Sequence, residues 1–235
     1  MSQPTMNPSS MNLSSTSPLD LSRMQPGLAD PVHDAQRCFR TVLEALSHPG
    51  RLHTLPVDVE HPAGLSPAQA AILLALADYD TPVWLPLASR NGDAGRYLRF
   101  HCGCPLVDTQ QGTPIDAPIG VRIDAPIDAP IDAQFVVLDG LSTLPALDTL
   151  RLGDPAYPDR SATVLVDVPA LQADGPLKLR GPGIRDTQAL GVAGWTPATS
   201  AWLADNHARF PLGADLILSC GDRIVGLPRT TLVEV

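Results

Sequence analysis

The chain is poor in charge, in aromatic residues and in lysine, and each shortage narrows its possible functions. Charged residues make up 17% of the 235 positions and aromatic residues 4%, and Lys178 is the single lysine. The net charge is −9 and no basic run is present, so nucleic acid and anionic membrane surfaces are not expected partners. A small anionic substrate needs a local positive site, because the overall field repels anions.

Long apolar runs are also missing. No stretch approaches the roughly 20 apolar residues that a membrane-spanning helix needs. Residues 1–28 lack the apolar core of a signal peptide, and their richness in Ser, Asn, Met and Pro predicts a disordered tail. Few cysteines and no export signal favour a cytoplasmic protein with reduced thiols.

The common signatures of catalysis are absent too. The sequence has no Walker A loop, no dinucleotide-binding glycine pattern, and no catalytic-serine, zincin or kinase pattern. Cys102 and Cys104 are spaced C-x-C without a second ligand pair, so no metal site is expected. Gly181-Pro-Gly183 lacks the Lys and Ser/Thr of a phosphate-binding loop and is interpreted as a plain turn. A pyridoxal-phosphate enzyme would depend on Lys178 alone.

What the sequence does contain is an alternation of helix and strand patterns. Asp30-Pro31 opens a helix that ends at Pro49-Gly50, and Ser66-Pro-Ala-Gln69 is a capping box that opens a second, apolar helix. A further helix runs from Thr196-Pro197 to about Ala208. Short apolar runs predict strands at 51–55, 83–85, 98–101, 134–138, 162–167 and 177–180. This alternation indicates an α/β fold with three layers.

The first helix has an apolar face at helical spacing. Its members are Val32, Ala35, Phe39, Val42, Leu43 and Leu46. Together with the apolar second helix it offers more nonpolar surface than one core needs, which favours a homodimer.

The last 29 residues, 207–235, form the most specific pattern of the chain. Asp215–Cys220 and Ile224–Leu227 read as two strands joined by a tight Gly-Asp turn, which predicts an antiparallel hairpin. Pro228 cannot donate to a ladder, so the chain bends there. Thr230–Val235 then alternates as a last strand.

Residues 112–133 form a low-complexity segment in which Ile-Asp-Ala recurs at 115, 123, 127 and 131. The period of four and the frequent prolines suit neither helix nor sheet, so we expect an extended, exposed loop. The domain organisation is therefore a tail over 1–28 and a single α/β domain over 29–235 that this loop interrupts.

Two small clusters are candidates for chemistry or assembly. Arg229, Thr230 and Thr231 combine a guanidinium with hydroxyls, which suits an oxyanion but equally a fold-defining turn or a subunit contact. Asp78 and Asp80 suit acid–base work, or they bind the backbone of the turn in which they lie. The sequence leaves these alternatives open.

Four separated blocks resemble, in the same order, the PhnH family of carbon–phosphorus lyase subunits. They are Asp30-Pro-Val-His-Asp-Ala-Gln-Arg-Cys-Phe-Arg with Ser47-His-Pro-Gly, Leu76-Ala-Asp-Tyr-Asp-Thr-Pro-Val-Trp-Leu, Leu98-Arg-Phe-His with Cys104-Pro-Leu-Val, and Phe210-Pro-Leu-Gly-Ala-Asp-Leu-Ile-Leu with Leu227-Pro-Arg-Thr-Thr. The resemblance covers about residues 30–107 and 160–235.

The resemblance implies a fold related to the large domain of the pyridoxal-phosphate-dependent transferases, without the cofactor. It implies a homodimer that works with the G, I, J and L subunits of the pathway. That assembly converts ATP and an alkylphosphonate such as methylphosphonate to α-D-ribose 1-methylphosphonate 5-triphosphate and releases adenine. ATP is then a substrate of the complex and not a cofactor of this chain.

Because the sequence shows no complete catalytic constellation, we expect an accessory subunit. The alternative is an enzyme whose own phosphonate or nucleotide site combines Arg229 with Asp78 and Asp80.

Overall fold

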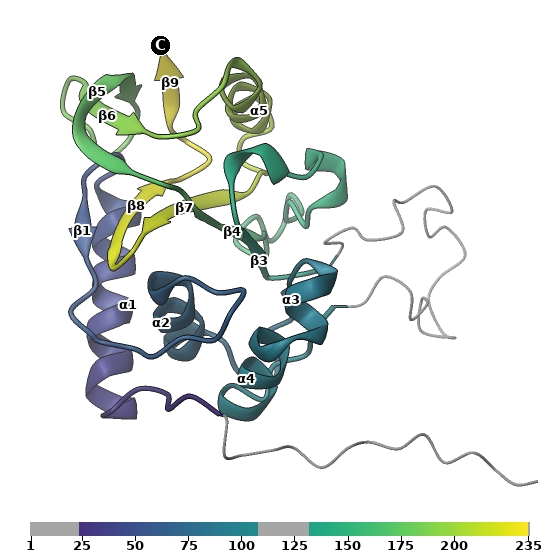
Figure 1. Ribbon diagram of the computed structural model, residues 1–235. Helices are drawn as coiled ribbons and strands as arrows, with labels where there is room; N and C mark the ends of the chain where they lie inside the picture. The colour runs from purple at the N-terminus through teal and green to yellow at the C-terminus, as the bar shows by residue number, and fades with distance from the viewer. Residues whose placement is uncertain (1–23, 108–131, 235) are drawn as a thin grey trace, which may run out of the picture.

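A six-stranded mixed sheet divides the molecule into layers, in a computed structural model that describes residues 24–107 and 132–234 (Figure 1). The strand order is β1-β8-β7-β4-β3-β2. Strands β2, β3, β4 and β7 are parallel, and β8 and β1 continue the sheet in antiparallel pairing. Their bounds are β1 His53–Thr54, β2 Val83–Trp84, β3 Phe135–Leu138, β4 Thr163–Asp167, β7 Asp215–Cys220 and β8 Arg223–Leu227.

Successive residues of each strand serve two different cores, as the pleat requires. Phe135 and Val137 pack in the core under the helices, whereas Val136 and Leu138 pack in the core on the other face. Both cores are apolar, which explains why these strands read as continuous hydrophobic runs rather than as alternating ones.

The helical layer contains α1 Pro31–Ser47, α2 Pro67–Leu76, α3 Leu87–Asn91 and α4 Asp93–His101. Two predicted helix starts are confirmed. Asp30 caps α1 by accepting from the amides of Val32 and His33, and Ser66 and Gln69 form a complete capping box on α2.

The strand predicted at 98–101 is wrong, because these residues form the last turn of α4. Ala94, Tyr97 and Leu98 are buried at helical spacing. A run of four residues was too short to distinguish a strand from the end of a helix.

The face that α1 buries also differs from the expectation. Val42 is buried, but Val32, Phe39 and Leu43 are 74%, 51% and 53% exposed. The helix instead buries small residues such as Ala45, and it approaches β8 so closely that a Cβ on Gly226 would lie 2.4 Å from the Ala45 carbonyl oxygen. Val32, Phe39 and Leu43, called the α1 stripe below, are left at the surface.

The third layer is a second sheet with a helix beside it. Antiparallel strands β6 Gln188–Val192, β5 Leu171–Arg180 and β9 Leu232–Glu234 form the sheet in that order, and α5 Pro197–Ala208 completes the layer (Figure 1). The predicted β7–β8 hairpin and the predicted α5 are confirmed. The last strand, however, leaves the main sheet, because β9 pairs with β5.

Most of the predicted tail and of the repeat loop, residues 1–23 and 108–131, lie outside the described residues. The end of the predicted tail is held on the domain. Met24 and Leu28 pack against the helical core, and the Tyr97 hydroxyl donates to the Pro26 carbonyl oxygen over 3.2 Å. None of the helices in the described part of the chain is long and apolar enough to cross a membrane.

Candidate functional site

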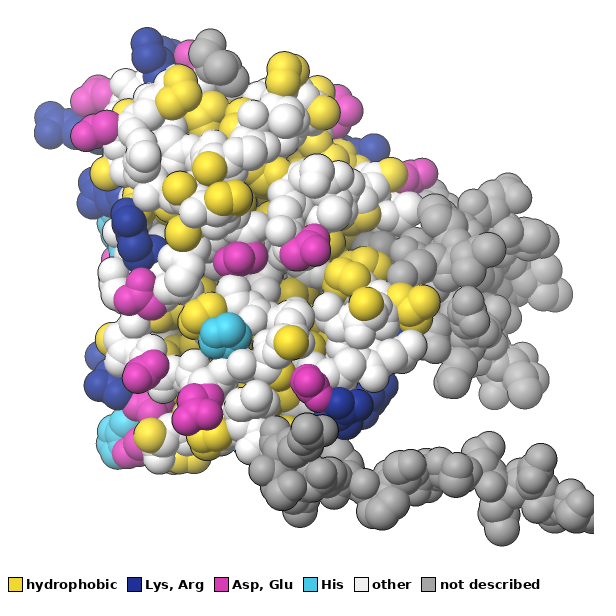
Figure 2. Space-filling model, in the orientation of Figure 1, with side chains coloured by type: hydrophobic (Ala, Val, Ile, Leu, Met, Phe, Trp, Pro, Cys, Tyr) yellow, Lys and Arg dark blue, Asp and Glu magenta, His cyan; other side chains and the backbone are white. Residues whose placement is uncertain are grey.

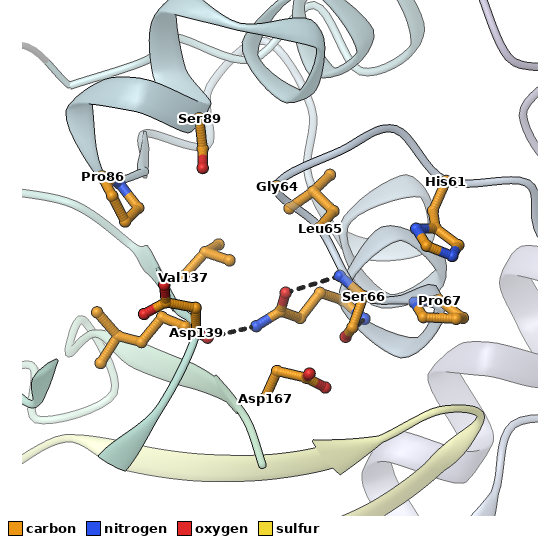
Figure 3. Close-up of a pocket in the computed structure, with 12 residues that line it drawn as sticks. His61, Gly64, Leu65, Ser66, Pro67, Pro86, Ser89, Val137, Asp139 and Asp167 are labelled. Carbon is orange, nitrogen blue, oxygen red and sulfur yellow. Dashed lines mark hydrogen bonds between the residues drawn. The ribbon is translucent and has the colours of Figure 1, made fainter. Parts of the chain in front are cut away.

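The carboxyl ends of β3 and β4 and the segment that follows β2 border a cavity of about 350 Å³ (Figure 3). The chain that leaves β2 enters α3 and α4 on the helical face, while the chain that leaves β3 enters η2 Leu141–Thr143 and η3 Leu147–Thr149 on the other face. Such divergence opens a crevice at the carboxyl edge, which is where α/β proteins bind ligands.

The cavity combines apolar walls with a few polar groups, as small-molecule sites do. Figure 3 shows Asp139 and Asp167 at the strand ends, with Ser66 and His61 on the α2 side and Ser89 on the α3 side. The apolar lining is Leu65, Pro67, Pro86, Val137 and Leu138.

Gln69 fixes the geometry of this edge. The residue is 2% exposed, and its Nε2 donates to the carbonyl oxygens of Leu138 and Leu165 over 2.8 and 3.3 Å. Its Oε1 accepts from the Ser66 amide over 3.0 Å. One buried amide therefore ties the ends of β3 and β4 to the start of α2.

The two carboxylates of the cavity belong to residues at the ends of β3 and β4. Asp139 is the residue after β3 and Asp167 is the last residue of β4. The Ser219 hydroxyl, at the end of the neighbouring β7, donates to Asp167 Oδ1 over 3.0 Å. This orients one carboxylate, whose second oxygen has no hydrogen-bond partner in the part of the chain that the structure describes.

The electrostatics of the cavity do not suit an anion. Among the described residues, the lining contains no lysine or arginine. The amides at the start of α2 are engaged by the chain itself: the Ala68 amide donates to the Gly221 carbonyl over 3.1 Å, and the Gln69 amide to Ser66 Oγ over 3.3 Å. The usual anion site at a helix N-terminus is therefore already filled. Figure 2 shows acidic side chains along the hollow in the middle of this face.

Arg229 lies at the opposite, amino edge of the main sheet, paired with a carboxylate of its own chain. Its Nε and Nη2 donate to the two oxygens of Asp215 over 3.1 and 2.7 Å. Its Nη1 donates to the carbonyls of Pro158 and Pro211, and Nη2 also donates to the Ser161 hydroxyl. With its side chain 11% exposed, Arg229 joins the loops that precede β4 and β7.

The turn before β7 lets the chain reach this arginine. Gly213 has a φ of 130°, and a Cβ at this position would lie 2.8 Å from the Asn206 side-chain oxygen. Asn206 in turn exchanges two hydrogen bonds with Ala214, of 2.8 and 2.9 Å. The turn before β7 is thus closed by α5.

The two threonines do not extend the guanidinium site. Thr231 is buried, its amide donates to the Pro228 carbonyl over 2.8 Å, and its hydroxyl has no hydrogen-bond partner among the described residues. Thr230 is half-buried in the same turn. The geometry here is that of a turn between β8 and β9.

Asp78 and Asp80 lie in the turn between α2 and β2. Asp78 Oδ1 accepts from the Thr81 hydroxyl over 2.7 Å and from the Asp80 amide over 3.0 Å. The Thr81 hydrogen bond, followed by the Asp80 amide, lowers the pKa of Asp78. Two strands stand between β2 and β7, so roughly 14 Å separates this turn from Arg229. The structure does not bring the two sequence candidates together.

The remaining candidates lie elsewhere. Lys178 is exposed on β5, in the outer sheet. A hydrogen bond with the Cys104 thiol, together with burial, raises the pKa of Cys102. In residues 24–107 and 132–234, no group of three or more possible metal ligands occurs.

The cavity residues Gln69, Asp139 and Asp167 were missed from the sequence. A usable signal existed, because each aspartate stands at the end of an apolar strand. Residues at the carboxyl ends of parallel strands share one edge. The role of Gln69 had no such signal, since its partners Leu138 and Leu165 are distant in sequence.

Comparison with known proteins shows which family this chain resembles. The family model described as bacterial phosphonate metabolism protein (PhnH) matches residues 26–115 and 113–234. The chain is 35% identical over 206 residues to the alpha-D-ribose 1-methylphosphonate 5-triphosphate synthase subunit PhnH of Rhizobium meliloti (strain 1021), covering 88% of this chain and 93% of that protein. It is 33% identical over 200 residues to the putative C-P lyase subunit protein HtxG of Stutzerimonas stutzeri, covering 85% and 86%. The chain belongs to the PhnH family of bacterial phosphonate metabolism proteins.

Proposed function

We propose that this chain is an accessory subunit of the assembly that makes α-D-ribose 1-methylphosphonate 5-triphosphate during the catabolism of organic phosphonates. The names of both relatives support the assembly, since one is a subunit of that synthase and the other a putative subunit of the carbon–phosphorus lyase. The accessory role is supported mainly by the positions of the positively charged side chains. Arg229 is paired with Asp215 inside the chain, and the lining of the cavity, within the described residues, lacks Lys and Arg.

In this proposal the partners are the G, I, J and L subunits of the pathway, and they supply the transferase and lyase chemistry. ATP and the alkylphosphonate are substrates of the whole assembly, and adenine is released. We place the assembly in the cytoplasm, where the free cysteines Cys38, Cys102, Cys104 and Cys220 stay reduced.

Co-expression tests the proposal directly. A tagged chain should co-purify with the partner subunits, and the assembly should release adenine from ATP and methylphosphonate only when this chain is included. The isolated chain should release none. Adenine release by the chain alone would establish the alternative, an enzyme in its own right.

The alternative site around Arg229, Asp78 and Asp80 has less geometric support. Its members lie on the two sides of β3 and β4, and Asp78 and Arg229 are each engaged by neighbours in their own part of the chain. A single small ligand cannot easily contact both clusters across roughly 14 Å.

We also propose that the fold is related to the large domain of the pyridoxal-phosphate-dependent transferases and that the chain works without a cofactor of its own. The fold relationship rests on the family resemblance alone. The absence of a cofactor is supported by the position of Lys178, which is exposed on the outer sheet and is absent from the cavity lining. Pyridoxal phosphate added to the protein should give no saturable Schiff-base absorbance, and a saturable band lost in Lys178→Ala would contradict this.

The α1 stripe supports the homodimer that we propose for the isolated chain. Its three large apolar side chains lie on one face of α1, with Arg40 and Glu44 exposed beside them. In an antiparallel pairing of two α1 helices about a twofold axis, Arg40 of each copy can approach Glu44 of the other, and the apolar stripes meet.

Light scattering of the isolated chain at micromolar concentration should therefore give the mass of a dimer. Leu43→Asp should shift the mass to that of a monomer, because it buries a charge in the contact. Leu87→Asp is a matched control, since Leu87 is a helical leucine that is 50% exposed on α3. A monomer mass for the unmodified chain would rule out the dimer.

A further inference from the structure

We propose that the cavity at the carboxyl edge binds a neutral ring with neighbouring hydroxyl groups, either a pentose or the ribose of a nucleoside, and that it excludes the phosphonate. The proposal deepens the proposed function, on which it rests, because ATP brings such a ribose to the assembly. The argument comes from the size, the walls and the hydrogen-bonding groups of the cavity.

The size of the cavity limits the ligand to a sugar or a nucleoside. Its volume of about 350 Å³ is near the lower end for ligand pockets, which run from roughly 300 to 1,000 Å³. Leu65, Pro67, Pro86 and Val137 supply apolar walls that suit the face of a ring. A complete nucleoside triphosphate would have to leave its phosphates outside.

The polar groups of the cavity favour a ligand that donates hydrogen bonds. The carboxylate oxygens of Asp139 and Asp167 act as hydrogen-bond acceptors, and a carboxylate that binds the ribose hydroxyls is a known solution at this edge of an α/β sheet. Asp167 is oriented by Ser219 through Oδ1, and its Oδ2 accepts no hydrogen bond from the described residues, so this oxygen can accept from a ligand. Ser89 and His61 line the other side and can complement the ring oxygens (Figure 3).

The same groups argue against a phosphonate in this place. A phosphonate needs donors and positive charge, but the lining has neither Lys nor Arg among the described residues, and the first amides of α2 are already used. Two carboxylates would repel the anion. A neutral polyol meets no such penalty.

Calorimetry of the full chain tests the assignment with adenosine, ribose and methylphosphonate as separate titrants. Adenosine or ribose should bind, and methylphosphonate should neither bind nor compete. Asp139→Asn and Asp167→Asn should each weaken binding about tenfold, the effect of losing a hydrogen bond to a charged group. Asp186→Asn is the control, because Asp186 is exposed in the loop between β5 and β6.

A second measurement uses the unmodified chain, so it does not depend on whether an aspartate variant folds. Adenosine bound to the unmodified chain should slow the reaction of His61 with diethyl pyrocarbonate, mapped by mass spectrometry, while exposed His33 on α1 reacts unchanged. The two arms also distinguish the source, since stronger binding of adenosine than of ribose identifies a nucleoside.

Three results would overturn the assignment: no binding of adenosine or ribose, binding of methylphosphonate that competes with them, or unchanged affinity in both aspartate variants. The proposed function is tested separately by co-purification with the partner subunits. Co-purification without adenosine binding would remove this inference and leave the function standing. Failure to co-purify would remove the function itself.

Discussion

Replacing Arg229 by alanine is expected to lower the free energy of unfolding by roughly 3–5 kcal/mol, the range for breaking a buried ion pair by removing one partner. The arginine is 11% exposed, and its guanidinium contacts Asp215, Ser161 and the carbonyls of Pro158 and Pro211. The truncation leaves the Asp215 carboxylate without its cation. It also releases the two loops that the guanidinium joins.

Denaturant unfolding measures this effect. Arg209→Ala is the matched control, since Arg209 is an exposed arginine at the end of α5, and its loss should change stability by no more than ~0.5 kcal/mol. In a double-mutant cycle with Asp215→Ala, the two changes should cost clearly less together than the sum of the single costs.

The contrary result has a clear meaning. If Arg229→Ala melts normally and assembles normally with the partner subunits, but the reconstituted complex loses activity, then Arg229 acts on a ligand. The accessory role proposed above would then be wrong, and the oxyanion interpretation of Arg229-Thr230-Thr231 would replace it.

Gln69→Ala is expected to lower the free energy of unfolding by about 3 kcal/mol, because it removes three hydrogen bonds of a buried side chain at about 0.5–1.5 kcal/mol each. The carbonyls of Leu138 and Leu165 lose their donor, and the Ser66 amide loses its acceptor. The capping box of α2 is broken at the same time.

Chemical denaturation again provides the measurement, with Gln36→Ala as control because Gln36 is exposed on α1. Gln36→Ala should be nearly neutral, since alanine is at least as good a helix former. The Gln69 variant should also lose affinity in the cavity, because the ends of β3 and β4 are no longer tied to α2. Unchanged stability would mean that water or a shift of α2 replaces the buried amide.

Local signals in the sequence identified the features whose partners are close in the chain. The cap at Asp30 and the capping box at Ser66 and Gln69 involve side chains and amides within three residues of one another, so the order of residues alone specifies them. The β7–β8 hairpin is likewise local, since a tight turn sets its register. The resemblance to the PhnH family also rested on such short blocks.

Features that depend on the packing of layers were decided by the tertiary structure. The sequence pattern of α1 predicts that its apolar face is buried. Small residues on another face of α1, together with Gly226, let the helix pack more closely against β8, so Phe39 and Leu43 remain exposed. For β9, pairing with β5 in the outer sheet competes with continuing the main sheet, and no local signal separates the two.

In the candidate site, too, some features follow from local sequence and others from tertiary packing. The sequence left Arg229 open between an oxyanion site, a fold-defining turn and a subunit contact, and it did not name Asp215 as its partner, because the two meet only when the β7–β8 hairpin closes. Asp139, Asp167 and Gln69 are brought together from three elements far apart in the chain. Residue type and spacing determine local conformation, whereas the side chains that share a cavity are fixed by long-range contacts between strands and helices.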